Sequence, residues 1–182
     1  MELQNLSEAL LNKAKRIKLL IMDVDGVLSD GKVYYSANGD EIKNFNIKDG
    51  LGIKLLHHAN IATAIITGRQ SAIVQRRADE LGIKHVIQGA SDKRQAFNDI
   101  ARTNNLDRQE IAHIGDDLPD LPLMIQSGLG IAVNDANWFV KQHADWITSA
   151  NGGAGAVRNT AELLLTSRDI LESTYQTYLS FD

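Results

Sequence analysis

Short apolar runs alternate with longer segments of helical period along most of the chain. The runs are continuous and rich in Ile, Leu and Val, which is typical of strands buried on both faces. The predicted strands are Ile17–Met22, Ile61–Ile66, His85–Ile87, Ile111–Ile114 and Gly130–Val133. The predicted helices are Gly50–His58, Ser71–Leu81, Asp92–Asn104 and Leu118–Gln126. This alternation predicts an α/β fold, a three-layer, doubly wound parallel sheet.

One segment, Lys32–Asn46, interrupts the alternation of strands and helices. Asn38-Gly39 lies there between the β-prone runs VYYS and EIKNFN. Because Asn-Gly tolerates the positive φ angles of a tight turn, we expect a projecting β-hairpin. The chain divides into a helical extension at residues 1–16, one compact domain at 17–170 and a C-terminal tail at 171–182.

Composition narrows the possible classes of protein. A chain of 182 residues with 43% hydrophobic residues is long enough for one well-buried domain. A net charge of -4 without a basic stripe argues against a nucleic-acid binder. No apolar run is long enough to span a bilayer, and the N-terminus lacks the apolar core of a signal peptide, so we expect a cytoplasmic protein. With no cysteine, a metal must bind oxygen or imidazole ligands, which favours a hard cation.

Polar side chains of the types used in catalysis and metal binding follow the predicted strands. Ligands of open parallel sheets bind at the carboxyl edge of the strands, where these loops meet. The loop residues are Asp23 and Asp25, then Thr67, then Lys93, then Asp116 and Asp117 with Asp120 beyond them. The loops therefore bring carboxylates, a hydroxyl and an ammonium group to one edge.

Each of these residues has an ordinary structural explanation, because Asp and Gly are common in turns and at helix N-caps. Lys93 is harder to explain in this way, since the helix dipole disfavours a cation in the first turn. Several carboxylates at one edge repel one another unless a cation holds them. Mg²⁺ suits such oxygen ligands, whereas Asp23-Val24-Asp25-Gly26 lacks the further ligands and distal Glu of an EF-hand.

The order of these motifs resembles a known family. The run IMDVDGVL, then ITGR, then Lys93, then GDDLPD is similar to the haloacid-dehalogenase-like phosphohydrolases over nearly the whole chain. Within that family the chain more closely resembles the 3-deoxy-D-manno-octulosonate 8-phosphate phosphatases. That resemblance lies in DVDGVLSDG, NFNIKDGLGIKLL, TGRQSAIVQRRADELGIKH and NGGAGAVR. It implies hydrolysis of a sugar-acid phosphate in the synthesis of the lipopolysaccharide inner core.

The resemblance also implies a role for each loop residue. Asp23 would attack phosphorus, and Asp25 would protonate the leaving alkoxide and then activate water. Thr67 and Lys93 would hold the transferring oxygens. Mg²⁺ would be bound by Asp23, the backbone carbonyl of Asp25, and Asp116. Asp117 and Asp120 would orient metal-bound water or Lys93 from outside the ligand set.

The substrate contacts implied by the resemblance extend beyond this set. They are Asn46, Ile47, Lys48, Asp49, Gly50, Arg69 and Arg77, together with Asp25 and Lys93. Arginine suits both the carboxylate and the phosphate of a sugar-acid phosphate. Without the resemblance, Arg77 would be equally compatible with a solvated helix face, and Lys48 and Asp49 with a loop entering a helix.

The gaps between the motifs leave no room for the cap domain of larger relatives. The segment Asp25–Thr67 is filled by the hairpin and one helix, and Thr67–Lys93 by one helix and one strand. Because an aspartyl phosphate needs shielding from water, we expect the hairpin to roof a neighbouring subunit's site. The enzymes that the chain resembles are tetramers, so we expect a homotetramer.

Alternative functions remain open from the sequence. The substrate could be another sugar-acid phosphate such as an N-acylneuraminate 9-phosphate, because the catalytic motifs do not define the leaving group. A non-catalytic phospho-ligand-binding module is disfavoured because the residues assigned to catalysis are all present. A phosphomutase is disfavoured because no cap is available to hold a bisphosphate while it reorients.

Overall fold

A six-stranded parallel sheet forms the centre of the protein in the computed structural model, which describes residues 6–179. The strands are β1 (Leu19–Met22), β4 (Ala62–Ile66), β5 (His85–Ile87), β6 (Ile111–Gly115), β7 (Leu129–Ala132) and β8 (Trp146–Ile147). Their order is β5-β4-β1-β6-β7-β8, and every neighbouring pair is parallel. The chain runs outward from β1 to β5 and then returns to β6 beside β1. The predicted doubly wound sheet is thus confirmed.

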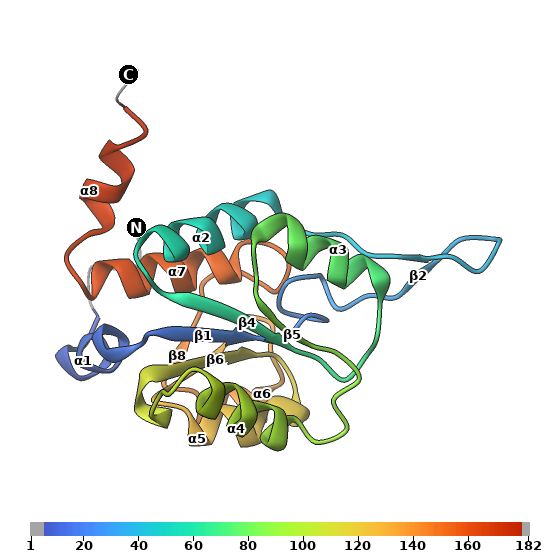
Figure 1. Cartoon of the computed structure of the whole chain (residues 1–182), viewed down its shortest axis with the longest axis horizontal. Coiled ribbons are helices and arrows are strands. Elements are labelled where there is room, and N and C mark those ends of the chain that lie inside the picture. Colours follow the sequence, from blue (N-terminus) through green and yellow to red (C-terminus); the bar gives the residue numbers. More distant parts are fainter. Residues whose placement is uncertain (1–5, 180–182) are drawn as a thin grey trace.

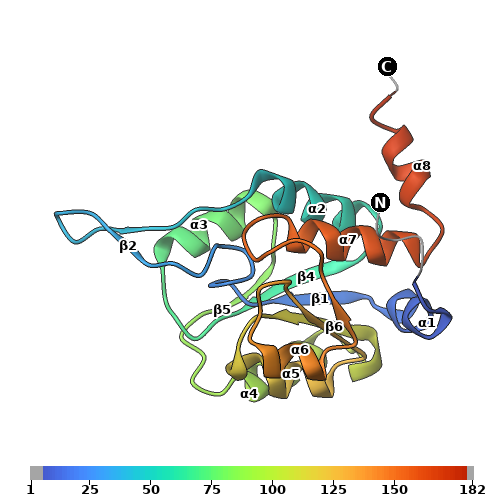
Figure 2. The same cartoon turned by 180° about the vertical axis from the view of Figure 1, so that it is seen from behind.

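Helices cover both faces of the sheet (Figures 1 and 2). One face carries α2 (Ile47–His58), α3 (Ala72–Leu81) and α7 (Ala156–Thr166). The other carries α4 (Lys93–Thr103), α5 (Leu121–Gln126) and α6 (Trp138–His143). Over residues 6–179 the remaining helices are α1 (Glu8–Arg16), α8 (Leu171–Gln176) and the 3₁₀ turns Arg108–Glu110 and Leu118–Asp120. Three layers result, as the sequence predicts.

The central strand, β1, is buried on both faces, which explains why its sequence does not alternate between apolar and polar residues. Leu20 and Met22 belong to one cluster of buried side chains, and Leu19 and Ile21 belong to a second. All four side chains are fully buried. Since both faces of β1 are covered, both sets of alternating positions are apolar.

The predicted hairpin projects from the body of the molecule (Figure 1). Its paired strands are only β2 (Tyr34–Tyr35) and β3 (Glu41–Ile42), in an antiparallel arrangement. The turn contains Gly39 at φ +85°, in the left-handed region that glycine favours. Over residues 6–179 the structure contains no cap domain, because hairpin and α2 fill the first gap and α3 and β5 fill the second.

Some elements differ from the prediction. The segment Leu118–Gln126 is divided into a 3₁₀ turn and α5, because Pro122 has no N–H to donate to the Leu118 carbonyl. Strand β8 and helices α6 and α7 were not predicted. The N-terminal helix begins at Glu8, and the extension's residues 1–5 lie outside the described part of the chain. The helices within residues 6–179 are too short or too polar to cross a membrane.

The C-terminal segment leaves the main body as α8, which points away from the three layers (Figures 1 and 2). Arg158 of α7 donates a hydrogen bond to the Tyr175 hydroxyl at 2.6 Å, so α8 is attached to the layer that contains α7. Residues 180–182 of the predicted tail lie outside the described part of the chain. The predicted limits of extension, domain and tail remain a prediction.

Candidate active site

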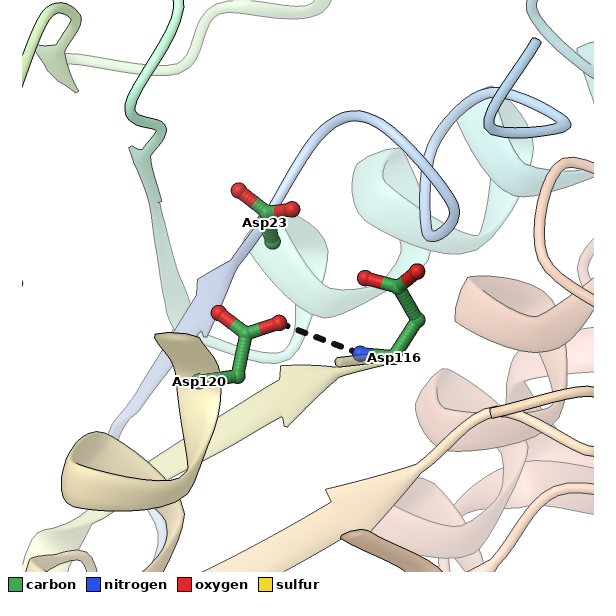
Figure 3. A group of neighbouring side chains, drawn as sticks. All are labelled: Asp23, Asp116 and Asp120. Atoms are coloured by element: carbon green, nitrogen blue, oxygen red, sulfur yellow. Dashed lines mark hydrogen bonds between the residues drawn. The ribbon is translucent and has the colours of Figure 1, made fainter. Parts of the chain in front are cut away.

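The carboxyl ends of three adjacent strands place the predicted chemical groups together. Asp23 follows β1, Thr67 follows β4, and Asp116 follows β6. Figure 3 shows Asp23, Asp116 and Asp120 around one space, with Asp120 on the 3₁₀ turn that follows β6. Lys93 enters from the first turn of α4. The structure therefore confirms the prediction that these loops meet at the carboxyl edge of the sheet.

Close contacts between loops explain two glycines at this edge. Gly26 has φ +90°, and a Cβ there would lie 2.1 Å from Asp116 Oδ2. A Cβ at Gly152 would lie 1.7 Å from the Gly26 carbonyl oxygen. Neither position accommodates a side chain, because the loop after β1 is pressed between the Asp116 carboxylate and the NGGAG loop. The two glycines thus allow the loop after β1 to lie directly against both neighbours.

Lys93 connects two of the three neighbouring carboxylates. Its Nζ donates to Asp23 Oδ1 at 3.0 Å and to Asp120 Oδ1 at 2.8 Å. One oxygen each of Asp23, Asp116 and Asp120 lies within 4.8 Å of the others. Three carboxylates therefore share one ammonium group, which leaves an excess of negative charge.

Asp120 has little remaining capacity to bind a metal. In addition to Lys93, its Oδ1 lies 3.2 Å from His113 Nε2, and its Oδ2 accepts the Asp116 backbone N–H at 3.1 Å. The side chain is 1% exposed. Asp120 thus positions Lys93 and the Asp116 loop. His113 was missed in the sequence, although a histidine inside the apolar run Ile111–Ile114 was the available signal.

The ionisation of these groups reflects burial and crowding. Burial, and then the charge of Asp120, raise the pKa of Asp23 to about 6. Burial, and then Asp120 and Asp23, raise the pKa of Asp116 to about 7. Burial also acts to raise the pKa of Asp120, but the hydrogen bond from His113 and the charge of Lys93 hold it well below its usual range. A divalent cation would offset the repulsion that raises the first two values.

The donor set fits Mg²⁺. Among the described residues, the cluster offers three carboxylates, whose oxygens are ligands that this ion prefers. Asp23 and Asp116 would hold the ion with the Asp25 carbonyl. Gly26 beside Asp116 keeps the space between the two loops free of a side chain. Asp117 lines the same pocket, and its Oδ1 accepts the Leu118 N–H at 2.8 Å.

Mg²⁺ affinity should fall as the pH falls from 8 to 5.5. Because the pKa values of Asp116 and Asp23 are about 7 and about 6, protons occupy both carboxylates in acid and the cation must displace them. The expected weakening is roughly tenfold or more. Titration calorimetry in two buffers of different ionisation enthalpy would measure both the affinity and the protons released. Equal affinity at both pH values, without proton release, would contradict the assignment of these ligands.

A cavity of about 240 Å³ contains most of the predicted site. Its lining includes eight of the predicted residues: Asp23, Asp25, Thr67, Arg69, Lys93, Asp116, Asp117 and Asp120. Gly68 and Pro119 complete it. Arg69 approaches Asp25 Oδ2 with its Nε at 3.7 Å.

The other predicted substrate contacts lie outside that lining. Asn46 is the N-cap of α2 and accepts the Lys48 N–H at 2.8 Å. Ile47, the next residue, is 82% exposed. Arg77 packs against Gly50, where a Cβ would lie 2.5 Å from its Nη2, and its guanidinium lies 5.9 Å from the Phe45 ring centroid. These residues form a second group beside the hairpin base.

Asp49 has a different environment from the one predicted for a substrate contact. It is 1% exposed, and its carboxylate accepts the Gly155 N–H at 3.2 Å and the Arg158 N–H at 2.8 Å. The side chain thus caps the N-terminus of α7 and joins α7 to α2. The carboxylate of Asp49 therefore has a structural role within this protomer, and the predicted contact of Asp49 with substrate stays a prediction.

Two charged residues of the hairpin, Glu41 and Lys43, reach the site although the sequence analysis did not select them. Lys43 Nζ forms an ion pair with Asp25 and lies 3.3 Å from Glu41 Oε1. Arg69 Nη2 lies 3.2 Å from the same Glu41 oxygen. The available signal was the alternation Glu41-Ile42-Lys43, which puts both charges on one face of a strand.

The fold and the carboxylate-lysine site are those of a phosphohydrolase class with an aspartate at the end of the first strand. A model of the haloacid dehalogenase-like hydrolase family matches residues 84–159. KdsC from Yersinia pestis, a 3-deoxy-D-manno-octulosonate 8-phosphate phosphatase, is 44% identical over 166 residues, which are 91% of this chain and 89% of that protein. KdsC from Escherichia coli K12 is 45% identical, and the match covers 91% of this chain and 88% of that protein.

Solved structures give the same result. A 3-deoxy-D-manno-octulosonate 8-phosphate phosphatase from Moraxella catarrhalis, in complex with magnesium, phosphate and KDO, matches with a TM-score of 0.91 at 44% identity. The match covers 93% of this chain and 97% of that chain. A probable phosphatase from Pseudomonas syringae matches at TM-score 0.94 and 46% identity over 97% and 100% of the two chains. The chain belongs to the haloacid dehalogenase-like hydrolases, in the family of 3-deoxy-D-manno-octulosonate 8-phosphate phosphatases.

Proposed function

We propose that the protein is a Mg²⁺-dependent phosphomonoesterase that converts 3-deoxy-D-manno-octulosonate 8-phosphate to the free sugar acid and inorganic phosphate. The observation that carries this proposal is the set of residues that line the 240 Å³ cavity. A nucleophile, an acid-base group, two groups that can hold phosphate oxygens and a metal ligand all line it. They are Asp23, Asp25, Thr67, Lys93 and Asp116. The relatives named above support the choice of substrate.

The reaction proceeds in two steps on the protein's own side chains. An Asp23 oxygen bonds to phosphorus while the ester P–O bond breaks, and the leaving alkoxide takes a proton from the Asp25 carboxyl. The Asp25 carboxylate then removes a proton from water, whose oxygen attacks phosphorus and releases Asp23 and phosphate. Lys93 and Thr67 hold the phosphate oxygens during both steps.

Bound Mg²⁺ supplies positive charge that lowers the repulsion between the Asp23 carboxylate and the phosphate dianion. Lys93 contributes to the same neutralisation. Burial acts to lower its pKa, but the charges of Asp120 and Asp23 outweigh this effect and raise it, so the ammonium form persists. Asp120 fixes that ammonium at 2.8 Å. The lysine is thus held beside the nucleophile before substrate arrives.

Arginines at the pocket and beside the hairpin suit the sugar acid. Arg69 lines the pocket, and Arg77 lies beside Gly50 in the second group of predicted contacts. A guanidinium binds a carboxylate through two parallel hydrogen bonds, which a lysine cannot reproduce. In the proposal these arginines, with the segment of Asn46, Ile47, Lys48, Asp49 and Gly50, recognise the substrate beyond its phosphate.

The proposal includes a homotetramer in the bacterial cytoplasm, with the reaction in lipopolysaccharide inner-core synthesis. The hairpin supports assembly, because Val33, Tyr34, Tyr35 and Ile42 are exposed large hydrophobic residues on it. We expect sedimentation at micromolar protein to give the mass of four chains, and Ile42→Asp to shift it to smaller species. A wild-type monomer would contradict the assembly.

Phosphate release from four compounds tests the substrate. The panel contains 3-deoxy-D-manno-octulosonate 8-phosphate, N-acetylneuraminate 9-phosphate, a hexose 6-phosphate and phosphoserine, each with Mg²⁺ and with EDTA. We expect a strong preference for the first compound, lost with EDTA. Weak release from all four would retain the chemistry but refute the substrate. No release from any would favour a phospho-ligand-binding module.

A further inference from the structure

Lys43 is a buried lysine that the catalytic scheme above does not use. Its side chain is 2% exposed and forms an ion pair with Asp25. A lysine rarely occupies such a position unless its charge is matched, because removing an ammonium group from water is unfavourable. Here Asp25 and Glu41 both face the ammonium, with Glu41 Oε1 at 3.3 Å. The protein therefore retains a buried charge at the residue proposed as acid and base.

The two oxygens of Asp25 have separate cationic neighbours. Lys43 contacts Oδ1, while Arg69 Nε lies 3.7 Å from Oδ2. Arg69 is about half exposed, and its Nη2 also contacts Glu41 at 3.2 Å. The stronger constraint on the carboxylate is thus Lys43, because it is both nearer and shielded from water. The carboxylates of Asp25 and Glu41 and the cations of Lys43 and Arg69 thus form a closed network of ion pairs at the base of the hairpin.

The Lys43 ammonium contacts Oδ1 of Asp25, the residue that takes a proton from water in the second step. We propose that Lys43 is a positioning residue that holds this carboxylate in the orientation for hydrolysis of the aspartyl phosphate. The inference rests on the proposed function, since it needs a phosphorylated Asp23. In the step concerned, Asp25 takes a proton from water, the water oxygen bonds to phosphorus, and the bond from phosphorus to Asp23 breaks.

The position of Lys43 directly after β3 links this role to the hairpin. Ile42, its neighbour, pairs with Tyr34 across the hairpin and is exposed, whereas Glu41 and Lys43 contact the site. Adjacent residues of a strand point to opposite faces. The segment Glu41-Ile42-Lys43 thus directs its charges to the active site on one side and Ile42 to the other.

Pre-steady-state kinetics with p-nitrophenyl phosphate tests the inference on full-length protein with Mg²⁺. Its leaving group departs without a proton donor, so the first step does not depend on Asp25. Lys43→Met should release about one equivalent of p-nitrophenolate per site rapidly and then turn over about 10-fold to 100-fold more slowly than wild type. Acid quench should trap phosphorylated protein. Lys43→Arg, which retains the cation, should recover most of the rate.

Lys32→Met is the matched control, because Lys32 lies at the same hairpin and its side chain is 70% exposed. It should leave burst and turnover unchanged, and thermal melting should show that the Lys43 variants are folded. Equal losses of burst and turnover in Lys43→Met, or no loss, would overturn the inference in favour of a structural role. A raised KM for the sugar-acid phosphate with unchanged kcat would overturn it in favour of substrate binding.

The outcomes also separate this inference from the proposed function. If wild type hydrolyses p-nitrophenyl phosphate but not the sugar-acid phosphate, the proposed substrate fails, and the Lys43 comparison still decides the positioning role. If wild type hydrolyses neither ester, both proposals fail.

Discussion

Asp23→Asn should lower phosphate release by about 10⁴-fold or more, which is the scale seen when a covalent nucleophile is removed. The amide nitrogen and oxygen of asparagine cannot form the phosphoryl intermediate that a carboxylate oxygen forms. The substitution keeps the shape of the side chain, and the amide oxygen can still accept the hydrogen bond from Lys93. Phosphate release in steady state, with substrate above KM, measures the loss.

The same substitution should stabilise the metal-free protein at pH 8. The pKa of Asp23 is raised from 3.8 to about 6, so the ionised side chain destabilises the folded state once the pH exceeds its ordinary pKa. A neutral amide removes that effect, with an expected gain of roughly 1 to 3 kcal/mol in the free energy of unfolding. The gain should disappear near pH 4, where Asp23 is protonated in wild type. Denaturant unfolding in EDTA at both pH values measures it.

Asp99→Asn is the control for Asp23→Asn, because it makes the same change of charge on the exposed surface of α4. It should alter neither activity nor stability by a comparable amount. Activity of Asp23→Asn above about a hundredth of wild type would refute Asp23 as the nucleophile. A variant that is inactive and less stable than wild type at pH 8 would instead show that the Asp23 carboxylate supports the fold.

The sequence predicts the sheet and the pocket because both depend on simple patterns. Strands buried on two faces need continuous apolar runs, as in β1. Loops at the carboxyl edge of parallel strands converge, so Asp23, Thr67 and Asp116 meet whatever the helix packing. Motif order and strand direction are sufficient for this part of the site.

Other features depend on tertiary contacts that the local pattern does not contain. Strand β8 is two residues long, and its neighbour β7 supplies its hydrogen bonds, so no periodicity marks it. The capping of α7 by Asp49 could not be predicted, because its partners Gly155 and Arg158 are more than 100 residues away in sequence. Lys43 reaches Asp25 only because the hairpin base folds over the site. Long-range hydrogen bonds and ion pairs decide these roles.

Lys93→Met should have the second-largest effect, since it removes the single cation that contacts both Asp23 and Asp120 among the described residues. Three neighbouring carboxylates then lack a buried counter-charge. The expected loss at pH 8 without metal is about 3 to 5 kcal/mol in the free energy of unfolding. Phosphate release should fall by about 100-fold to 1000-fold, because a positive group that contacts the transferring oxygens is lost.

The loss of stability in Lys93→Met should shrink as the pH falls towards 5. Lys93 lowers the pKa values of both Asp23 and Asp116, so without it they rise above about 6 and about 7, and both side chains become neutral in mild acid. Asp120 ionises at lower pH than either, so part of the loss should persist. Arg94→Gln is the control, because this neighbouring cation is exposed and pairs with Asp92. Denaturant unfolding of both variants at pH 8 and pH 5, with and without Mg²⁺, separates the charge of Lys93 from its packing. A loss independent of pH and of Mg²⁺ would show that Lys93 stabilises the fold through its methylene groups and not as the counter-charge of the acidic cluster.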